Sequence, residues 1–521
     1  MTSKDTTALD DKGLRAQAGK SIAWVFSSSA AIALSRVVLF AGLARLLQPA
    51  DFGLYAATTS VLGILEIVSL MGVGPSLIQR EQLTGRHIST ALFLAICFGG
   101  VATAVMWLAA GPIAASMRID GLEPVLKILS PIFFIRSLSM VGNGLASRDM
   151  NFSLISRVEI VSYIFGYGLF SIVLAAAGFG AWSLILGYII QQALATVLIT
   201  LPYGKLLSFR FYRGEMKELL GFSSGISLAN IANYVAQQGD YYMVGRTLGV
   251  ESLGLYNRAY NLMQVSVAAV INTLDRVLFP ALAKMQSDAA SLAKALRLST
   301  ALVWMAYLPL SMVLTVCASD VVAVLLGRKW LGMTGAFRIL TYGLLFRAGY
   351  KMAGTVLKVK GQVLSFAITQ IVYAVMVVMG AAVGARHGGI EGTATGVLIA
   401  LGVNYFLLNY LGFRSVQQRF AHLYRDLLAA LILTVASLIV SAAVLHLTMQ
   451  LGFRPLLRLA CVGLLVTGAY ILVFWALLRT LVSKETGGFL RSTWQSLAGH
   501  QSKIRRRLRK MRPARPKLAK A

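Results

Sequence analysis

One segment of this chain occurs twice, and the two copies lie 201 residues apart. The first copy reads ARLLQPADFGLY and begins at Ala44, and the second reads GRTLGVESLGLY and begins at Gly245. Arginine, leucine and Gly-Leu-Tyr keep their register, and each copy has an acidic residue near the turn. An internal repeat in a strongly apolar chain is typical of transporters built from two similar lobes around a central site.

The composition indicates a membrane protein with helical spans. The mean hydropathy is +0.71, and 13% of the residues are charged, about half of the roughly 25% found in soluble domains. Apolar stretches of about 20 residues, long enough to cross a bilayer as helices, recur along the chain. They are continuous, as in 431–444, whereas barrel strands alternate apolar and polar residues over about 10 positions. The expected fold class is therefore an all-α polytopic membrane protein.

The apolar stretches predict about 14 transmembrane helices, arranged as two six-helix lobes and an extra C-terminal pair. Because each lobe has an even number of spans, both lobes enter the membrane in the same orientation, and a pseudo-twofold axis along the membrane normal relates them. The expected parts are a cytoplasmic N-terminal segment (1–20), the N-lobe (21–202), a cytoplasmic connector (203–218), the C-lobe (219–415), two additional spans (416–481) and a basic cytoplasmic tail (482–521).

The basic residues predict the orientation. The formal net charge is +29, and Lys and Arg concentrate in alternate loops and in the tail, the pattern of cytoplasmic segments. Both termini are therefore expected in the cytoplasm. The densest basic run, 503–512, is expected to meet anionic membrane lipids, and no nucleic-acid partner is expected. The three cysteines fall in apolar spans, without the spacing of a disulfide framework or a metal site.

Five segments resemble the Wzx-type polysaccharide flippases of the MOP superfamily, most closely the branch typified by the colanic acid exporter. The segments are LARLLQPADFGLY (43–55), LASRDMNF (145–152), GLYNRAYNL (254–262), RVLFPALAKMQ (276–286) and GRKW (327–330). The resemblance implies a carrier in the bacterial inner membrane. Its cargo would be an oligosaccharide on a polyprenyl pyrophosphate, translocated by alternating access for exopolysaccharide or O-antigen synthesis. It also implies a polysaccharide polymerase and export machinery as partners.

Charged residues within apolar spans are the first candidates for the site. A charge near the middle of a span costs about 2.5–3.5 kcal/mol on insertion scales, so it normally faces protein or water. Fixed guanidinium groups bind phosphate oxygens in bidentate fashion. Structural pairing is the competing role for the four arginines among the candidates, and reaching the membrane interface is the competing role for the lysine. The candidates for binding the substrate pyrophosphate are Arg36, Arg136, Arg258, Arg347 and Lys351.

The span around Arg36 offers two further observations. Ser35-Arg36 resembles the first-span Ser-Arg of the related flippases for lipid-linked peptidoglycan precursors, where cavity-facing arginines matter for function. At the offset of the repeat, Arg36 aligns with Gln237, so the two lobes differ in charge there. The matched pairs Arg45/Arg246 and Tyr55/Tyr256 are instead expected to be architectural. The two arginines are expected to snorkel or to bond carbonyls in the following turn.

Two acidic residues and a group of polar residues complete the predicted site. Asp240 and Glu66 fit two roles equally, coupling to an ion or proton and pairing with an arginine. The polar residues suit hydrogen bonding or stacking on sugars, and interhelical hydrogen bonding is the alternative. The candidates for lining a sugar-binding cavity are Asn233, Tyr234, Gln237, Tyr241, Asn257, Tyr260 and Asn261.

Several chemistries lack a motif in the sequence. No Gly-rich loop ending in Gly-Lys-Ser/Thr occurs, which argues against ATP hydrolysis, and no metal-binding motif occurs. No cofactor, metal or catalytic residue is expected, so the chain is not expected to be an enzyme. Two alternatives remain, a cation-coupled multidrug exporter of the same superfamily and a membrane-embedded glycosyltransferase or polymerase. The exporter requires Asp240 or Glu66, and the transferase requires paired acidic residues.

Overall fold

The computed structural model describes residues 35, 38–69, 77, 83–206, 208–220, 224–284, 289–418, 423–480 and 482. All regular secondary structure in these residues is helical, and no strand occurs among them. Eight of their helical segments are long and apolar enough to cross a membrane: 85–117, 122–148, 152–176, 181–204, 292–316, 364–415, 424–450 and 455–477. These segments confirm an all-helical, multi-pass membrane protein.

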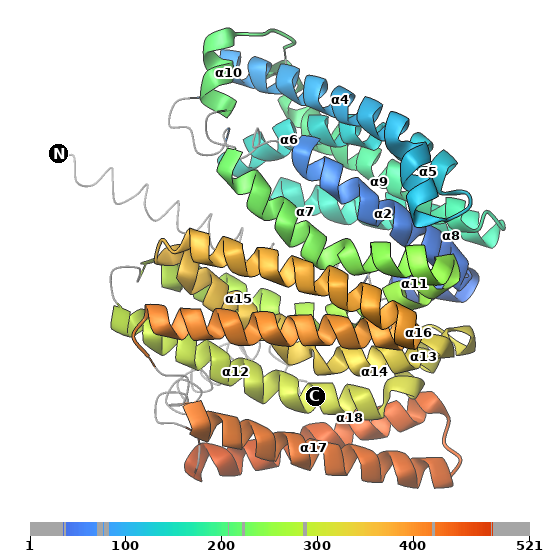
Figure 1. Cartoon of the computed structure of the whole chain (residues 1–521), viewed down its shortest axis with the longest axis vertical. Helices are drawn as coiled ribbons and strands as arrows, with labels where there is room; N and C mark the ends of the chain where they lie inside the picture. The colour runs from blue at the N-terminus through green and yellow to red at the C-terminus, as the bar shows by residue number, and fades with distance from the viewer. Residues whose placement is uncertain are drawn as a thin grey trace, which may run out of the picture. The chain divides into compact units, whose positions relative to one another are not determined.

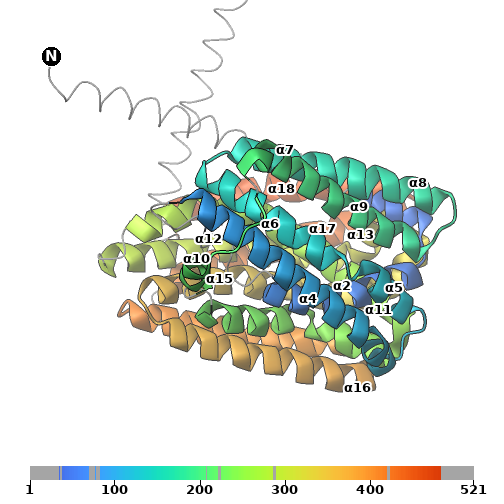
Figure 2. The same ribbon diagram turned by 90° about the horizontal axis from the view of Figure 1, so that it is seen from above.

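The first half of the chain forms a series of closely spaced helices (Figure 1). Residues 38–46 are helical and precede α2 (Pro49–Ser69). The helices that follow are α4 (Gly85–Met117), α5 (Leu122–Leu129), α6 (Ile132–Arg148), α7 (Phe152–Val161), the π-helix η1 (Ser162–Leu169), α8 (Phe170–Ala176), α9 (Ala181–Thr200), the 3-10 helix η2 (Leu201–Leu206) and α10 (Arg213–Leu220). The run α7–η1–α8 packs along α9, as Figure 2 also shows.

The second half contains two very long helices that bend at glycines. Its elements are α11 (Ser224–Lys284), α12 (Ala289–Val316), α13 (Ala318–Leu325), the 3-10 helix η3 (Arg328–Met333), α14 (Thr334–Tyr342), α15 (Leu344–Val359), α16 (Val363–Ser415), α17 (Tyr424–Gln450) and α18 (Pro455–Thr480). Gly249 interrupts α11 with φ 83°, and Gly389 interrupts α16 with φ 57°. Both values lie in the left-handed region that glycine adopts without steric cost. Each long helix is therefore two helices joined by a glycine turn.

The chain forms two compact units. The first unit contains residues 1–266, 318–343 and 364–404, and the second contains 267–317, 344–363 and 405–521. Each sequence copy of the repeat lies in the first unit. That unit also contains the turn of α16.

The two repeat copies contact each other reciprocally within the first unit. A Cβ atom built on Gly53 of α2 would lie 1.8 Å from the carbonyl oxygen of Val250 in α11. A Cβ on Gly254 would lie 1.8 Å from the carbonyl oxygen of Pro49. Gly53 and Gly254 are equivalent in the repeat, and so are Pro49 and Val250. Two equal contacts between exchanged positions are what a local twofold axis produces, and only glycine permits this backbone approach.

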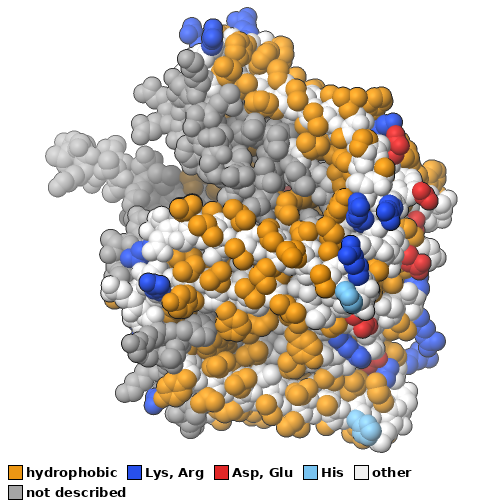
Figure 3. Space-filling view, viewed as in Figure 1, with side chains coloured by type: hydrophobic (Ala, Val, Ile, Leu, Met, Phe, Trp, Pro, Cys, Tyr) orange, Lys and Arg blue, Asp and Glu red, His pale blue; other side chains and the backbone are white. Residues whose placement is uncertain are grey.

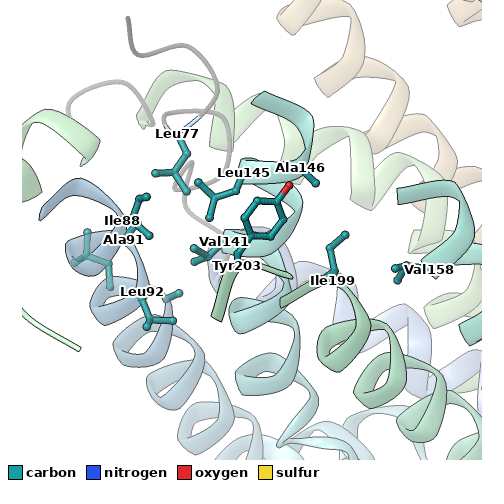
Figure 4. Close-up of a cluster of buried hydrophobic side chains, with 12 residues drawn as sticks. Leu77, Ile88, Ala91, Leu92, Val141, Leu145, Ala146, Val158, Ile199 and Tyr203 are labelled. Atoms are coloured by element: carbon teal, nitrogen blue, oxygen red, sulfur yellow. The ribbon is translucent and has the colours of Figure 1, made fainter. Parts of the chain in front are cut away.

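The connector packs against the first unit's own helices. Tyr203 lies in a hydrophobic cluster with Leu77, Val141 and Leu145 (Figure 4), and its hydroxyl donates to Asp149 Oδ2 at 3.2 Å. Further along, the rings of Phe209 and Phe211 lie 5.2 and 5.0 Å from the Phe93 ring of α4. The described part of the connector is therefore fixed to α4 and α6.

The second unit has its own side-chain hydrogen bonds. The Trp304 indole donates to Tyr405 Oη at 2.7 Å, and Tyr470 of α18 donates to the Met305 carbonyl at 3.1 Å. α17 packs on both α12 and α18. Buried polar side chains in an apolar bundle require such partners.

The outward-facing side chains match a lipid environment. α4 exposes Val101, Trp107 and Leu108, with exposed fractions of 62, 53 and 72%. Hydrophobic side chains dominate the face shown in Figure 3, and charged side chains gather toward the helix ends. Such surfaces are stable in lipid and would aggregate in water.

Candidate functional site

Arg258 is enclosed by aromatic rings in the first unit. Its guanidinium carbon lies over two phenylalanine rings, 3.5 Å from the centroid of Phe52 and 4.6 Å from that of Phe40. The side chain is 6% exposed, and its Nε has no hydrogen-bond acceptor among the described residues. No ion pair with Arg258 occurs in this part of the chain either. The tyrosines close enough to interact with its charge are Tyr55, Tyr163, Tyr167 and Tyr241.

A buried arginine without a carboxylate partner is suited to an anionic ligand. Burial of an isolated charge is costly, so such groups are normally paired. Stacking on aromatic faces offsets part of that cost by about 2 kcal/mol when the cation is desolvated. The in-plane N–H groups of guanidinium remain the donors for an oxyanion. Arg258 was predicted as a phosphate ligand. It is the cation that this role requires, and the rings around it exclude water.

The repeat explains how the ring cage is built from both copies. Phe52 and Tyr55 belong to the first copy and Phe40 lies four residues before it, whereas Arg258 follows the second copy on α11. At the same offset, Arg258 corresponds to Ala57 and Phe52 to Leu253. The stacked arrangement of this cation on these rings therefore has no equivalent at the repeat-related positions.

An ion pair lies beside this cage. Arg136 of α6 contacts both oxygens of Glu66 in α2, at 2.5 and 2.8 Å, and its Nη1 also donates to Tyr188 Oη at 3.0 Å. The Tyr188 ring lies 6.3 Å from the Tyr55 ring, which links the pair to the surroundings of Arg258. The Arg136 and Glu66 side chains are 28 and 22% exposed. Pairing, one of the two roles open to Glu66, is present in the structure.

Neutralising one member of this pair is expected to cost more than neutralising both. Glu66→Gln or Arg136→Gln leaves an uncompensated charge and should destabilise the protein by about 1–3 kcal/mol, less than a fully buried pair because both side chains keep some exposure. The double variant should recover most of the loss. Thermal unfolding of the purified protein in detergent measures this. The exposed pair Glu123–Lys127 is the control and should change stability little. Equal stability of all three Glu66/Arg136 variants would contradict a coupled pair.

Asp240 is more deeply enclosed than Glu66. It is 1% exposed, Tyr256 Oη donates to its Oδ2 at 2.8 Å, and the Tyr241 amide donates to its Oδ1 at 2.9 Å. The Tyr241 ring meets the Tyr256 and Tyr260 rings at 5.9 and 5.6 Å. Interhelical and local hydrogen bonding is therefore present at Asp240. Its coupling role stays a prediction.

The predicted sugar-binding residues also make contacts within the first unit. Tyr234 donates to the Thr59 carbonyl at 2.9 Å and so connects α11 to α2. The amides pair along their own helix, Gln237 with Asn233 at 3.0 Å and Asn261 with Asn257 at 3.0 Å. Asn257 and Tyr260 are buried, with 6 and 3% exposure.

The remaining phosphate candidates are Arg36, Arg347 and Lys351. Arg36 is outside the described residues. Arg347 and Lys351 belong to α15 in the second unit, where Arg347 is 4% exposed and Lys351 is exposed. One turn of helix separates them, yet their surroundings differ.

The matched arginines of the repeat bond carbonyls, but not in the turns that follow them. Arg45 Nη2 donates to the Val324 carbonyl at 2.9 Å, and Arg246 Nη1 donates to the Ser116 carbonyl at 2.7 Å. The expectation of local partners was wrong. Each arginine instead bonds a carbonyl at a helix end, where carbonyls lack partners within their own helix.

The GRKW segment caps the helix that contains Arg45. Lys329 Nζ donates to the carbonyls of Arg45 and Leu47, and Trp330 Nε1 donates to that of Ala44 at 2.8 Å. Burial lowers the pKa of the Lys329 ammonium, and the nearby Asp51 carboxylate opposes this shift. A cation at a helix C-terminus interacts favourably with the helix dipole. This role is not visible in the sequence, because the partners are some 280 residues apart.

Among the described residues, no cluster of three or more His, Cys, Asp and Glu side chains could hold a metal ion. The site instead offers one caged arginine, an adjacent ion pair and a set of tyrosines. These groups can bind an anion and hydrogen-bond hydroxyl groups.

Known proteins resemble this chain in sequence and in fold. Residues 42–335 match the family model described as polysaccharide biosynthesis protein. The lipopolysaccharide biosynthesis protein WzxC of Escherichia coli (strain K12) is 24% identical over 379 residues, which cover 72% of this chain and 76% of WzxC. The solved structure of the lipid II flippase MurJ in an inward closed conformation aligns with a TM-score of 0.72 at 13% identity, covering 88% of this chain and 100% of MurJ. An inward-facing multidrug resistance transporter of the MATE family aligns with a TM-score of 0.63 at 16% identity, covering 74% of this chain and 94% of that one.

The described spans make the chain a multi-pass membrane protein, and its fold is that of the MOP-superfamily transporters. The chain belongs to the family of polysaccharide biosynthesis proteins, whose model matches more than half of it. The resemblance read from the five segments is thereby confirmed. The structural neighbours are transporters, not enzymes.

Proposed function

We propose that this protein is a flippase that moves a polyprenyl-pyrophosphate-linked oligosaccharide across the bacterial inner membrane. The observation that carries the proposal is Arg258, buried on two aromatic rings with an unused Nε donor. A pyrophosphate head group carries negative charge that cannot cross hydrocarbon bare, and a fixed guanidinium offsets its lost hydration. Membership of the polysaccharide biosynthesis family supports a sugar cargo.

The proposed architecture consists of the N-lobe (21–202) and the C-lobe (219–415), with spans 13 and 14 outside the repeat. The reciprocal contacts of Gly53 and Gly254 support a twofold relation between the lobes. Positive charge on alternate loops supports cytoplasmic termini. The turn regions that contain Pro49 and Val250 would then face the periplasm. In alternating access, the contact between them would separate to release the cargo.

Within the proposed site, each group has a separate task. Arg258 and Arg136 would hold the pyrophosphate, with Arg36, Arg347 and Lys351 as further candidates for that task. The tyrosines and amides would contact the sugars. Protonation or cation binding at Glu66 or Asp240 would couple transport to an ion gradient, and a polysaccharide polymerase would receive the product.

Transport by the purified protein tests the proposal directly. Liposomes that contain the protein and a fluorescent polyprenyl-pyrophosphate-linked oligosaccharide should show faster exchange between leaflets than protein-free liposomes. Deleting the gene should reduce surface polysaccharide in the bacterium that carries it. No acceleration together with unchanged polysaccharide would exclude the flippase. Extrusion of drugs that requires Glu66 or Asp240 and tolerates loss of Arg258 would favour the cation-coupled exporter.

A further inference from the structure

The contact with Phe52 restricts the position of the Arg258 guanidinium as well as stabilising its charge. Phe52 is fully buried, and its ring meets the Trp330 ring edge-on at 5.4 Å and 63°. The Trp330 indole is itself held by its bond to the Ala44 carbonyl. Trp330 and Arg258 therefore both pack against the Phe52 ring. With its carbon 3.5 Å from the ring centroid, the guanidinium has little freedom to move.

A planar cation held against a ring must accept its ligand through its remaining edges. Guanidinium donates five hydrogens in its own plane, so a ring beneath it restricts where acceptor oxygens can lie. Nε is one donor that is buried and without an acceptor among the described residues. Phe40 borders the same cation at 4.6 Å. An oxyanion would therefore have to approach this cation in the plane of the guanidinium.

We infer that Phe52 is the positioning residue that orients Arg258 toward the diphosphate of the cargo. The inference rests on the proposed function and extends it, because it assigns recognition of the anion to a cation–ring unit and not to Arg258 alone. The repeat supports a specialised role. Position 253, which is equivalent to Phe52, is leucine, and no arginine stands at the equivalent of Arg258. An apolar residue is thus sufficient for the helix crossing, and the ring is needed only where the cation lies.

Binding measurements on the full-length protein in detergent test this role. The probe is a short-chain polyprenyl diphosphate, compared with the matching monophosphate. Phe52→Leu should weaken diphosphate binding about 30-fold, the loss of a desolvated cation–ring contact. Phe52→Tyr keeps the ring face and should remain within about threefold of the wild type. Phe133→Leu removes a ring that is buried to the same degree and has no cation contact among the described residues, so binding should not change.

A double-variant cycle separates positioning from a structural role. In an Arg258→Gln background, Phe52→Leu should have no further effect on binding, because the ring then has no cation to orient. Equal losses in both backgrounds, or equal binding by Phe52→Leu and Phe133→Leu, would overturn the inference. Competition by inorganic pyrophosphate would assign recognition to the diphosphate itself, and its absence would assign recognition to the lipid-linked head group.

The two proposals fail in different ways. Diphosphate binding that depends on Phe52, in a protein that moves no lipid-linked sugar, would overturn the flippase and keep the positioning role. Normal transport and normal binding by Phe52→Leu would keep the flippase and overturn the positioning role.

Discussion

Arg258→Gln is expected to reduce transport of lipid-linked oligosaccharide by about 30-fold or more while leaving the protein folded. Losing the charged partner of a buried anion costs about 2–5 kcal/mol, which sets the size of the defect. Stability should stay constant or rise, because removing a buried charge that lacks an ionic partner relieves its desolvation. Exchange of the labelled cargo in liposomes measures the first effect, and thermal unfolding in detergent measures the second.

A loss of transport without a loss of stability makes this prediction selective. If Arg258 were a structural residue, its loss would lower the melting temperature together with transport. Arg258→Lys should give an intermediate rate, because lysine keeps the charge but loses the planar fork. Arg157, an exposed arginine that bonds the Ser153 carbonyl of its own helix, is the control, and Arg157→Gln should behave as the wild type. Full transport by Arg258→Gln would exclude Arg258 as the anion ligand.

The sequence predicts the helices and the charged candidates because both depend on local composition. Apolar runs of membrane length predict spans, and the described spans occur where these runs lie. Arg258, Glu66 and Asp240 could be selected because a charge in an apolar run is costly wherever it points. The repeat also predicts a twofold relation between the lobes, and Gly53 and Gly254 make reciprocal contacts with the opposite copy of the repeat.

Partners are harder to predict, because they depend on which helices meet. Glu66 and Arg136 are 70 residues apart, and nothing local to either indicates the other. The sequence did not predict the rings of Phe40 and Phe52 around Arg258. An aromatic residue in an apolar run gives the same sequence pattern whether it faces lipid or a cation. Two of the tyrosines near Arg258, Tyr163 and Tyr167, could have been found in the sequence, because their spacing of four places them on one helix face.

Adding one methyl group at the helix crossing is expected to destabilise the protein strongly. A Cβ on Gly53 would lie 1.8 Å from a backbone oxygen of α11, and no rotamer change can move a Cβ atom away from it. Overpacking usually costs about 1–3 kcal/mol when side chains can adjust. Gly53→Ala should therefore reach the top of that range or exceed it. Gly254→Ala should do the same, because its Cβ would meet the Pro49 oxygen at the same distance.

The two substitutions should not be additive, because they act on one crossing. Once α2 and α11 have moved apart to admit the first methyl group, the second finds space already made, so the double variant should be little worse than either single variant. Thermal unfolding in detergent measures all three. Gly100→Ala is the control, since nothing lies within 4 Å of a Cβ there, and alanine favours a helix by about 0.5–1 kcal/mol.

Phe52 adjoins Gly53, so the same separation should move its ring away from Arg258. The transport rate of Gly53→Ala should then fall by more than the loss of folded protein accounts for. A fall equal to the loss of folded protein would show that the helix crossing and Arg258 are independent.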